Sequence, residues 1–322
     1  RFEPRHRLRC RPHAVRALLA RPSEMTGRTI HGITNALRTD TETIIFSNAG
    51  RAGNVRTAVV GHVEWIRFAT VERMPGAGEI IHARESWLEP AGGGAVAAAE
   101  LLRLTDNCDF FVAVGNDETG RAAREALEAL GLRVHVAVRD KPQRLGFTYL
   151  EANGERTITL VGEKLHPYGS DPLPWGELAE IDAVYFSAGD GDALRAARQA
   201  RVLVATAREL PTLADAGVEL DALVHSSTDP EETYSPGQLE PEPKLVVTTR
   251  GREGGSYRAG GHAGSFDAAP PPGPVADAYG AGDCFAAGLA FSLARGDGVE
   301  EALAFAAACG AEAMTRRGVA GN

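Results

Sequence analysis

The stretch that decides the fold is 277-DAYGAGD-283, which a run of small and apolar residues at helical spacing follows at once. The motif sets a Gly-Ala-Gly turn between two aspartates, Asp277 and Asp283. An aspartate at the start of a helix can cap free backbone N–H groups and complement the helix dipole. The same N–H groups can instead hold a phosphate while the acid beside them accepts a proton. The motif therefore predicts either a structural cap or a phosphate-handling site.

Outward from this motif, strand-like and helix-like segments alternate along the chain. Strands are expected at 57–61, 108–115, 132–138, 181–189, 201–206, 220–227 and 244–251, and helices at 92–104, 117–130, 192–200, 283–295 and 299–316. This alternation predicts an α/β fold with a mostly parallel sheet that helices cover on both faces.

Antiparallel segments interrupt this alternation. Residues 64–73 and 79–89 flank the turn 74–78, and residues 145–161 form a second hairpin around the tight turn Asn153-Gly154. We expect both hairpins to build a small separate sheet, a lid over about 62–90 and 145–161. A third ribbon is expected over 254–268.

Bulk composition narrows the function class. The chain has 322 residues, is 43 % hydrophobic and carries a net charge of −9, which suits one globular domain and argues against nucleic acid or anionic membrane as a partner. Four scattered cysteines predict neither zinc nor a disulfide framework and favour a cytoplasmic setting. Residues 1–54 have a different, basic and irregular texture, so we expect an N-terminal extension of unassigned function before a domain at 55–322.

Two motifs resemble one family. The C-terminal stretch closely resembles the Asp-Thr-x-Gly-Ala-Gly-Asp signature of the ribokinase-like, PfkB-type carbohydrate kinases, and "PAGGGAVAAAELLRL" followed by "VAVGNDETG" resembles their N-terminal signature. The similarity covers about residues 57–320. It implies a ribokinase-like three-layer sandwich with a small β-sheet lid. It also implies ATP-dependent phosphorylation of a hydroxymethyl group on a small sugar or sugar derivative.

The resemblance assigns the catalytic roles. Backbone N–H groups of Gly280, Ala281 and Gly282 would hold the transferring phosphate, because these residues carry little or no side chain. Asp283 would accept the proton of the attacking hydroxyl. Asp277 would lie at a site for a monovalent cation such as K⁺.

The resemblance also implies a nucleotide site with ATP and Mg²⁺. Thr249 and Gly251 match a loop that lies along the nucleotide, and Ala307 and Gly310 match a helix that walls the adenine. The magnesium would be held mainly by phosphates and water. Asp229 and Glu231 stand near the family's magnesium-loop motif, whose asparagine is absent here.

The substrate end departs from the family pattern. Glu64 and Ile66 replace the Asn-x-Asp of ribokinase-type sequences, Gly93 stands where lysine is common, Val96 where asparagine is common, and Tyr279 where threonine is usual. The expected substrate residues are Glu64, Gly92, Gly93, Val96 and Asp190, with His62 and Arg67 as further candidates. An arginine there would suit an anionic substrate such as a sugar acid or sugar phosphate.

Alternatives remain open at this point. A nucleoside kinase of the same fold would suit an apolar contact at Val96, and a non-catalytic ligand-binding relative would suit the altered sugar contacts. A nicotinamide-dependent oxidoreductase is disfavoured, because "VVGHVEW" lacks the glycine fingerprint after the first strand. We expect no nucleic-acid or membrane partner, and a homodimer through the lid is plausible.

Overall fold

The computed structural model describes residues 55–151 and 155–319. The predictions for residues 1–54 and for the Asn153-Gly154 turn fall outside these described residues. The family resemblance begins at residue 57, so the expected kinase domain lies almost entirely within them.

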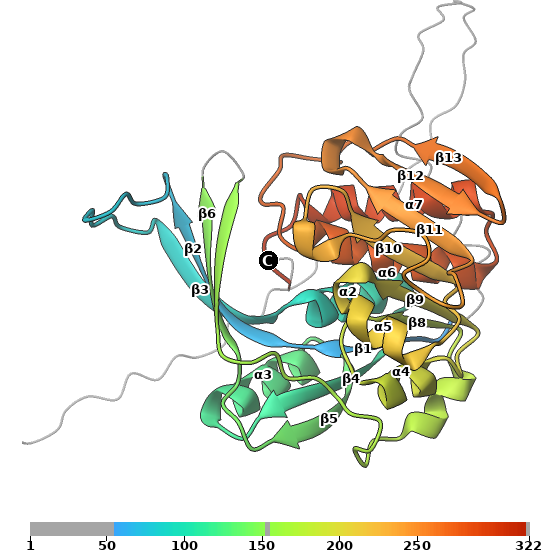
Figure 1. Ribbon diagram of the computed structural model, residues 1–322. Coiled ribbons are helices and arrows are strands. Elements are labelled where there is room, and N and C mark those ends of the chain that lie inside the picture. Colours follow the sequence, from blue (N-terminus) through green and yellow to red (C-terminus); the bar gives the residue numbers. More distant parts are fainter. Residues whose placement is uncertain (1–54, 152–154, 320–322) are drawn as a thin grey trace, which may run out of the picture. The chain divides into compact units, whose positions relative to one another are not determined.

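A nine-stranded sheet, sheet A, forms the centre of the domain, with strand order β13-β12-β11-β10-β9-β8-β1-β4-β5 (Figure 1). Its strands are β1 (Thr57–His62), β4 (Cys108–Gly115), β5 (Arg133–Arg139), β8 (Ala183–Phe186), β9 (Val202–Thr206), β10 (Ala222–Ser226), β11 (Leu245–Thr249), β12 (Gly255–Ala259) and β13 (His262–Phe266). The strands from β11 to β5 pair in parallel, and β12 and β13 add an antiparallel ribbon. The expected mostly parallel sheet and the third ribbon are confirmed.

Helices cover both faces of sheet A. One core cluster joins one face to α2 (Gly93–Thr105), α3 (Glu118–Ala129), α6 (Ala281–Arg295) and α7 (Val299–Ala313). A second cluster joins the other face to α4 (Gly191–Ala197), α5 (Leu210–Ala216) and the 3₁₀ helix η1 (Trp175–Glu180). Shorter 3₁₀ turns are η2 (Ala207–Glu209), η3 (Pro230–Glu232) and η4 (Gly251–Glu253). This is the expected three-layer arrangement.

Helix α5 was not predicted. It has seven residues and buries only Leu213, so it leaves no readable helical period in the sequence. A proline in its first turn and Gly217 in the left-handed conformation after its end fix its limits instead.

The lid is a separate four-stranded sheet, sheet B, with order β3-β2-β6-β7. Its strands are β2 (Glu64–Val71), β3 (Glu85–Ala91), β6 (Leu145–Glu151) and β7 (Arg156–Val161). Parallel pairing of β2 with β6 joins the two predicted hairpins edge to edge. Period-2 alternation then gives the lid an inner face with a small core of Ile66, Phe68 and Leu150, and an outer face that carries exposed apolar side chains.

The topology places a switch point at the carboxyl ends of the parallel strands. The chain leaves β1 for β4 on one side, whereas β8 pairs with β1 on the other side, so the strand order reverses between them. Ligands bind open α/β sheets at such a switch point. Within the described part of the chain, every helix is too short or too polar to cross a membrane.

Candidate active site

The turn before α6 is shaped by glycine. Gly280 is the N-cap of α6 with φ 74°, and a Cβ there would stand 2.6 Å from Val96 Cγ1, so only glycine fits. Ala281 and Gly282 begin the helix, and no side chain caps it. The N–H groups of this turn are therefore available to an anion.

Asp283 lies in the first turn of α6 but does not cap it. Among the described residues its carboxylate has one hydrogen-bond partner, the Tyr185 hydroxyl, which donates to Oδ1 at 3.5 Å. Burial raises the pKa of Asp283 to about 7, and the negative charge of Glu232 adds to the rise. A structural cap would be hydrogen-bonded and acidic, whereas this carboxylate is free and titrates near neutrality.

A second glycine turn faces Asp283. Gly92 has φ 88° and precedes α2, and a Cβ on Gly93 would stand 2.6 Å from Asp283 Oδ1. The two predicted motifs, nearly 190 residues apart in the sequence, thus meet at one carboxylate. The lysine that is common at residue 93 in the family would not fit beside this rotamer of Asp283.

Gly92 also lies against predicted substrate residues. Its N–H donates to the Tyr279 hydroxyl at 2.9 Å, and a Cβ there would stand 3.1 Å from Glu64 Cγ and 3.2 Å from the His62 ring. Glu64 is buried, which raises its pKa, and Arg144 at 3.2 Å from Oε1 opposes that rise. Glu64, Gly92 and Gly93 are therefore brought together beside Asp283.

Tyr279 packs the turn at residues 277–283 against the lid. Its ring makes a T-shaped contact with Phe68, with 5.1 Å between ring centroids, and packs into the core of the lid's inner face. The ring is thus packed against the lid, and the hydroxyl reaches the substrate turn.

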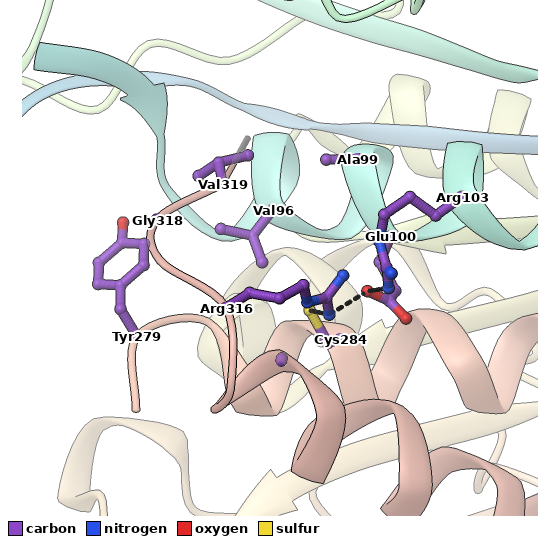
Figure 2. Close-up of a pocket in the computed structure, with 10 residues that line it drawn as sticks. Val96, Ala99, Glu100, Arg103, Tyr279, Cys284, Arg316, Gly318 and Val319 are labelled. Atoms are coloured by element: carbon purple, nitrogen blue, oxygen red, sulfur yellow. Dashed lines mark hydrogen bonds and ion pairs between the residues drawn. The ribbon is translucent and has the colours of Figure 1, made fainter. Parts of the chain in front are cut away.

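Three expected substrate residues do not join this group. Val96 is buried with Cys284 and Ala313 behind the catalytic turn, where Figure 2 shows it lining a small pocket. Asp190 caps α4, because its Oδ1 accepts hydrogen bonds from two backbone N–H groups at 2.8 Å. Arg67 is exposed and its NH1 donates to Ser86 Oγ at 3.2 Å.

The same pocket contains a buried ion-pair cluster (Figure 2). Glu100 on α2 is buried, and its Oε2 accepts from Arg103 at 2.5 Å and from Arg316 at 2.8 Å. Arg316 belongs to the segment after α7, so the cluster ties that segment to α2. The residues that line this pocket pack against the turn at residues 277–283.

Sequence reasoning missed a group of basic residues at the substrate side. Burial lowers the pKa of His62 well below its ordinary value, and the positive charges of Lys164, Arg144 and Arg208 add to this. Lys164 pairs with Glu209. Arg144 and Lys164 flank the hairpin of β6 and β7, whereas Arg208 lies in η2, and no local motif marks the three together.

Arg208 is surrounded by acids. It pairs with Asp229, with Glu231 at 3.3 Å and with Glu232 at 3.8 Å, all on or beside η3. The two acids expected near a magnesium loop thus lie together, next to an arginine whose charge also acts on Asp283.

Asp277 is a buried acid with a spare oxygen. Its Oδ1 accepts from Tyr279 N at 2.7 Å, whereas Oδ2 is buried without a hydrogen-bond partner in the described part of the chain. Burial raises its pKa, and the backbone N–H groups of Tyr279 and Gly318 oppose the rise. An unpaired buried carboxylate oxygen of this kind suits a cation.

The predicted nucleotide residues lie on β11, η4 and α7, and one of them, Gly310, approaches the turn before α6. Thr249 ends β11 and Gly251 begins η4 with φ 56°. Ala307 and Gly310 lie on α7, and a Cβ on Gly310 would stand 3.0 Å from the Ala281 carbonyl oxygen. Helix α7 therefore passes close to the catalytic turn.

Comparisons with known proteins agree with this geometry. The family model described as pfkB family carbohydrate kinase matches residues 56–322. An ATP-dependent ribose-1-phosphate kinase from Halopiger xanaduensis is 29 % identical over 292 residues, which cover 82 % of this chain and 93 % of that protein. A ribokinase from Arabidopsis thaliana is 25 % identical over 284 residues, which cover 78 % of this chain and 73 % of that protein.

Solved structures show the same fold. The ribokinase from Thermotoga maritima superposes with a TM-score of 0.65 at 20 % identity, covering 83 % of this chain and 95 % of that one. Arabidopsis thaliana ribokinase complexed with ribose and ATP gives 0.63 at 22 % identity, covering 83 % and 94 %. The expected ribokinase-like fold is confirmed.

Proposed function

Because the chain belongs to the pfkB family of carbohydrate kinases, we propose that it transfers the γ-phosphoryl group of ATP to a hydroxymethyl group of a small sugar, with Asp283 as the general base. The observation that carries this proposal is the state of Asp283. Its carboxylate is free of capping bonds, has a pKa of about 7 and stands beside uncapped helix N–H groups. Phosphoryl transfer needs this kind of positioning and charge stabilisation more than covalent chemistry.

Each residue of the site has a distinct role in this reaction. The acceptor hydroxyl lies beside the Asp283 carboxylate, and Asp283 takes its proton as the oxygen attacks. The N–H groups of Gly280, Ala281 and Gly282 hold the oxygens of the transferring group, and the N-terminal end of α6 adds its positive dipole. Glu64, Gly92 and the Tyr279 hydroxyl orient the sugar.

The nucleotide would lie along the carboxyl end of β11 and against α7. Thr249 and Gly251 contact its phosphate side, and Ala307 and Gly310 leave room for a flat base. This part of the proposal is supported by the close approach of Gly310 to the catalytic turn.

Two cations belong to this proposal. Asp229, Glu231 and Glu232 pair with Arg208, so Mg²⁺ would be held mainly by the ATP phosphates and water beside these acids, and it would neutralise charge on the phosphates when bound. Asp277 offers a buried, unpaired oxygen for a monovalent cation such as K⁺.

A sugar phosphate is a second candidate for the acceptor. The positive charges of Lys164, Arg144 and Arg208 all act on His62, and each of these cations also pairs with a carboxylate, so an anionic substituent would compete with these pairs. The similarity to a protein named ribose-1-phosphate kinase favours the same acceptor class.

The outer face of the lid supports a homodimer. Leu88, Phe147 and Val161 are exposed there to 43 %, 44 % and 52 %, an apolar surface that a second copy of the chain would cover. Phe147→Asp should give monomers in sedimentation velocity, and an unchanged sedimentation coefficient would refute this interface. A cytoplasmic setting is supported by Cys108, Cys284 and Cys309, which are free and buried.

An ATP-consumption assay tests the proposal. Purified protein is incubated with Mg-ATP and a panel of pentoses, hexoses, sugar acids, sugar phosphates and nucleosides. We expect turnover with a sugar or sugar phosphate, and a loss of about 100-fold in Asp283→Asn, the usual scale for a positioned base. Turnover only with nucleosides would reassign the substrate. No turnover, with a ligand that raises the melting temperature, would identify a binding protein.

A further inference from the structure

An arginine of the lid reaches the catalytic turn. Arg156 begins β7, and its NH1 donates to the carbonyl oxygen of Ala278 at 2.7 Å. Ala278 lies between Asp277 and Tyr279, two residues before the glycine turn. The lid strands therefore contact the motif at two places: Phe68 packs against the Tyr279 ring, and Arg156 donates to Ala278.

The strand register fixes the direction of this arginine. Arg156 pairs with Leu150, and Leu150 is buried in the core of the lid's inner face. Directly paired residues share a face of a sheet, so Arg156 belongs to the inner face, toward the site.

The guanidinium of Arg156 is exposed and has no ion-pair partner among the described residues. Among the described residues no carboxylate lies within 4.0 Å of Arg156, and the bond to Ala278 is its single hydrogen bond. Burial raises the pKa of both Asp283 and Asp277, and the charge of Arg156 is among those that oppose each rise. An arginine with spare donors thus lies near both acids of the motif.

We propose that Arg156 is a catalytic residue that contacts the phosphoryl group in transit between ATP and the acceptor. The inference rests on the proposed function. As the acceptor oxygen forms its bond to the γ-phosphorus, the bond to the β,γ-bridging oxygen breaks, ADP leaves, and the acceptor's proton passes to Asp283. Negative charge spreads over the three equatorial oxygens, which match the planar fork of a guanidinium.

The position of Arg156 on the lid would couple phosphoryl transfer to the position of the lid. Arg156 comes from sheet B, so its contact with the turn depends on the lid lying over the site. Lids of this kind exclude water and limit wasteful hydrolysis.

Steady-state kinetics of three variants test this role. We expect Arg156→Gln to lower kcat about 100-fold, the scale for losing one transition-state donor, while KM for ATP changes less than about 3-fold. Arg156→Lys keeps the charge without the fork and should fall between. The control is Arg84→Gln, which removes an exposed lid arginine that pairs with Glu72 at 3.3 Å. Melting temperatures verify that each variant is folded.

A binding measurement separates transition-state contact from a structural latch. Affinity for ADP with fluoroaluminate, Mg²⁺ and the acceptor should drop in Arg156→Gln, whereas affinity for a non-hydrolysable ATP analogue should not. Wild-type kcat in Arg156→Gln would overturn the inference, as would a loss confined to KM for the acceptor. If wild type phosphorylates nothing, the proposed function fails; if wild type is active and Arg156→Gln equals it, this inference alone fails.

Discussion

Gly93 lies directly against Asp283, so that a Cβ on residue 93 would stand 2.6 Å from Asp283 Oδ1. Real Cβ atoms essentially never approach a heavy atom this closely. The contact joins the start of α2 to the start of α6, and it leaves no room for a side chain at residue 93.

Gly93→Ala should therefore impair catalysis more than folding. The added methyl group pushes the Asp283 carboxylate out of its position, and a displacement of about 1 Å can cost on the order of 100-fold in kcat/KM. Gly176→Ala is the control, because a Cβ there meets nothing within 4 Å. Equal kcat/KM in both variants would show that Asp283 is not held against this turn.

The pH dependence of the rate should report the pKa of Asp283. A general base must be deprotonated, and burial raises this pKa from 3.8 to about 7. We expect kcat/KM to rise about tenfold per pH unit below pH 7 and to level off above it. A rate that stays constant down to pH 5 would exclude Asp283 as a base with this pKa.

The same carboxyl should reduce stability at alkaline pH. Between pH 3.8 and about 7 the folded chain binds a proton that the unfolded chain has lost, so the free energy of unfolding falls as pH rises through this window. Asp283→Asn removes the charge. We expect it to match wild type near pH 3, to exceed it by about 1.5 kcal/mol at pH 5, and to exceed it at pH 8 by up to about 4 kcal/mol in urea unfolding. Lower stability of the variant at pH 8 would contradict the raised pKa.

Features that depend on local sequence patterns could be predicted, whereas features that depend on contacts between distant segments could not. Sheet A, sheet B and the turn at Gly280 depend on local alternation and glycine spacing, which the sequence displays directly. The substrate side depends on Lys164, Arg144 and Arg208, whose charges act on His62 and which come from the flanks of a lid hairpin and from η2. No local pattern encodes such a convergence.

Two site assignments show the same limit. Val96 and Asp190 were expected to contact substrate because of their places in the motifs and loops. Their side chains are instead used for packing behind the turn and for capping α4. A motif predicts where the backbone goes, whereas the direction of a side chain depends on its tertiary neighbours.

The buried cluster at Glu100 should make an asymmetric contribution to stability. Arg316 is largely buried and joins the segment after α7 to α2, whereas Arg103 is 38 % exposed, lies one helical turn from Glu100 and also pairs with Glu312 on α7 at 3.1 Å. Arg316→Met weakens the compensation of a buried charge, so we expect a loss of about 3 kcal/mol in urea unfolding. Arg103→Met, the matched control, should cost less than about 1 kcal/mol. The reverse order would mean that Arg316 does not neutralise Glu100.

Asp277 should make the activity depend on a monovalent cation. Its Oδ2 is buried without a hydrogen-bond partner among residues 55–151 and 155–319, and Oδ1 already accepts from Tyr279 N, so a bound cation would satisfy the spare oxygen and fix the turn before Gly280. At constant ionic strength, replacing K⁺ by the larger tetramethylammonium ion should lower kcat/KM roughly 5-fold or more. Asp277→Asn keeps the bond to Tyr279 N through its amide oxygen but weakens cation binding, and we expect its lower rate to be the same in both salts. Wild-type rates that are equal in K⁺ and tetramethylammonium would contradict a cation site at Asp277.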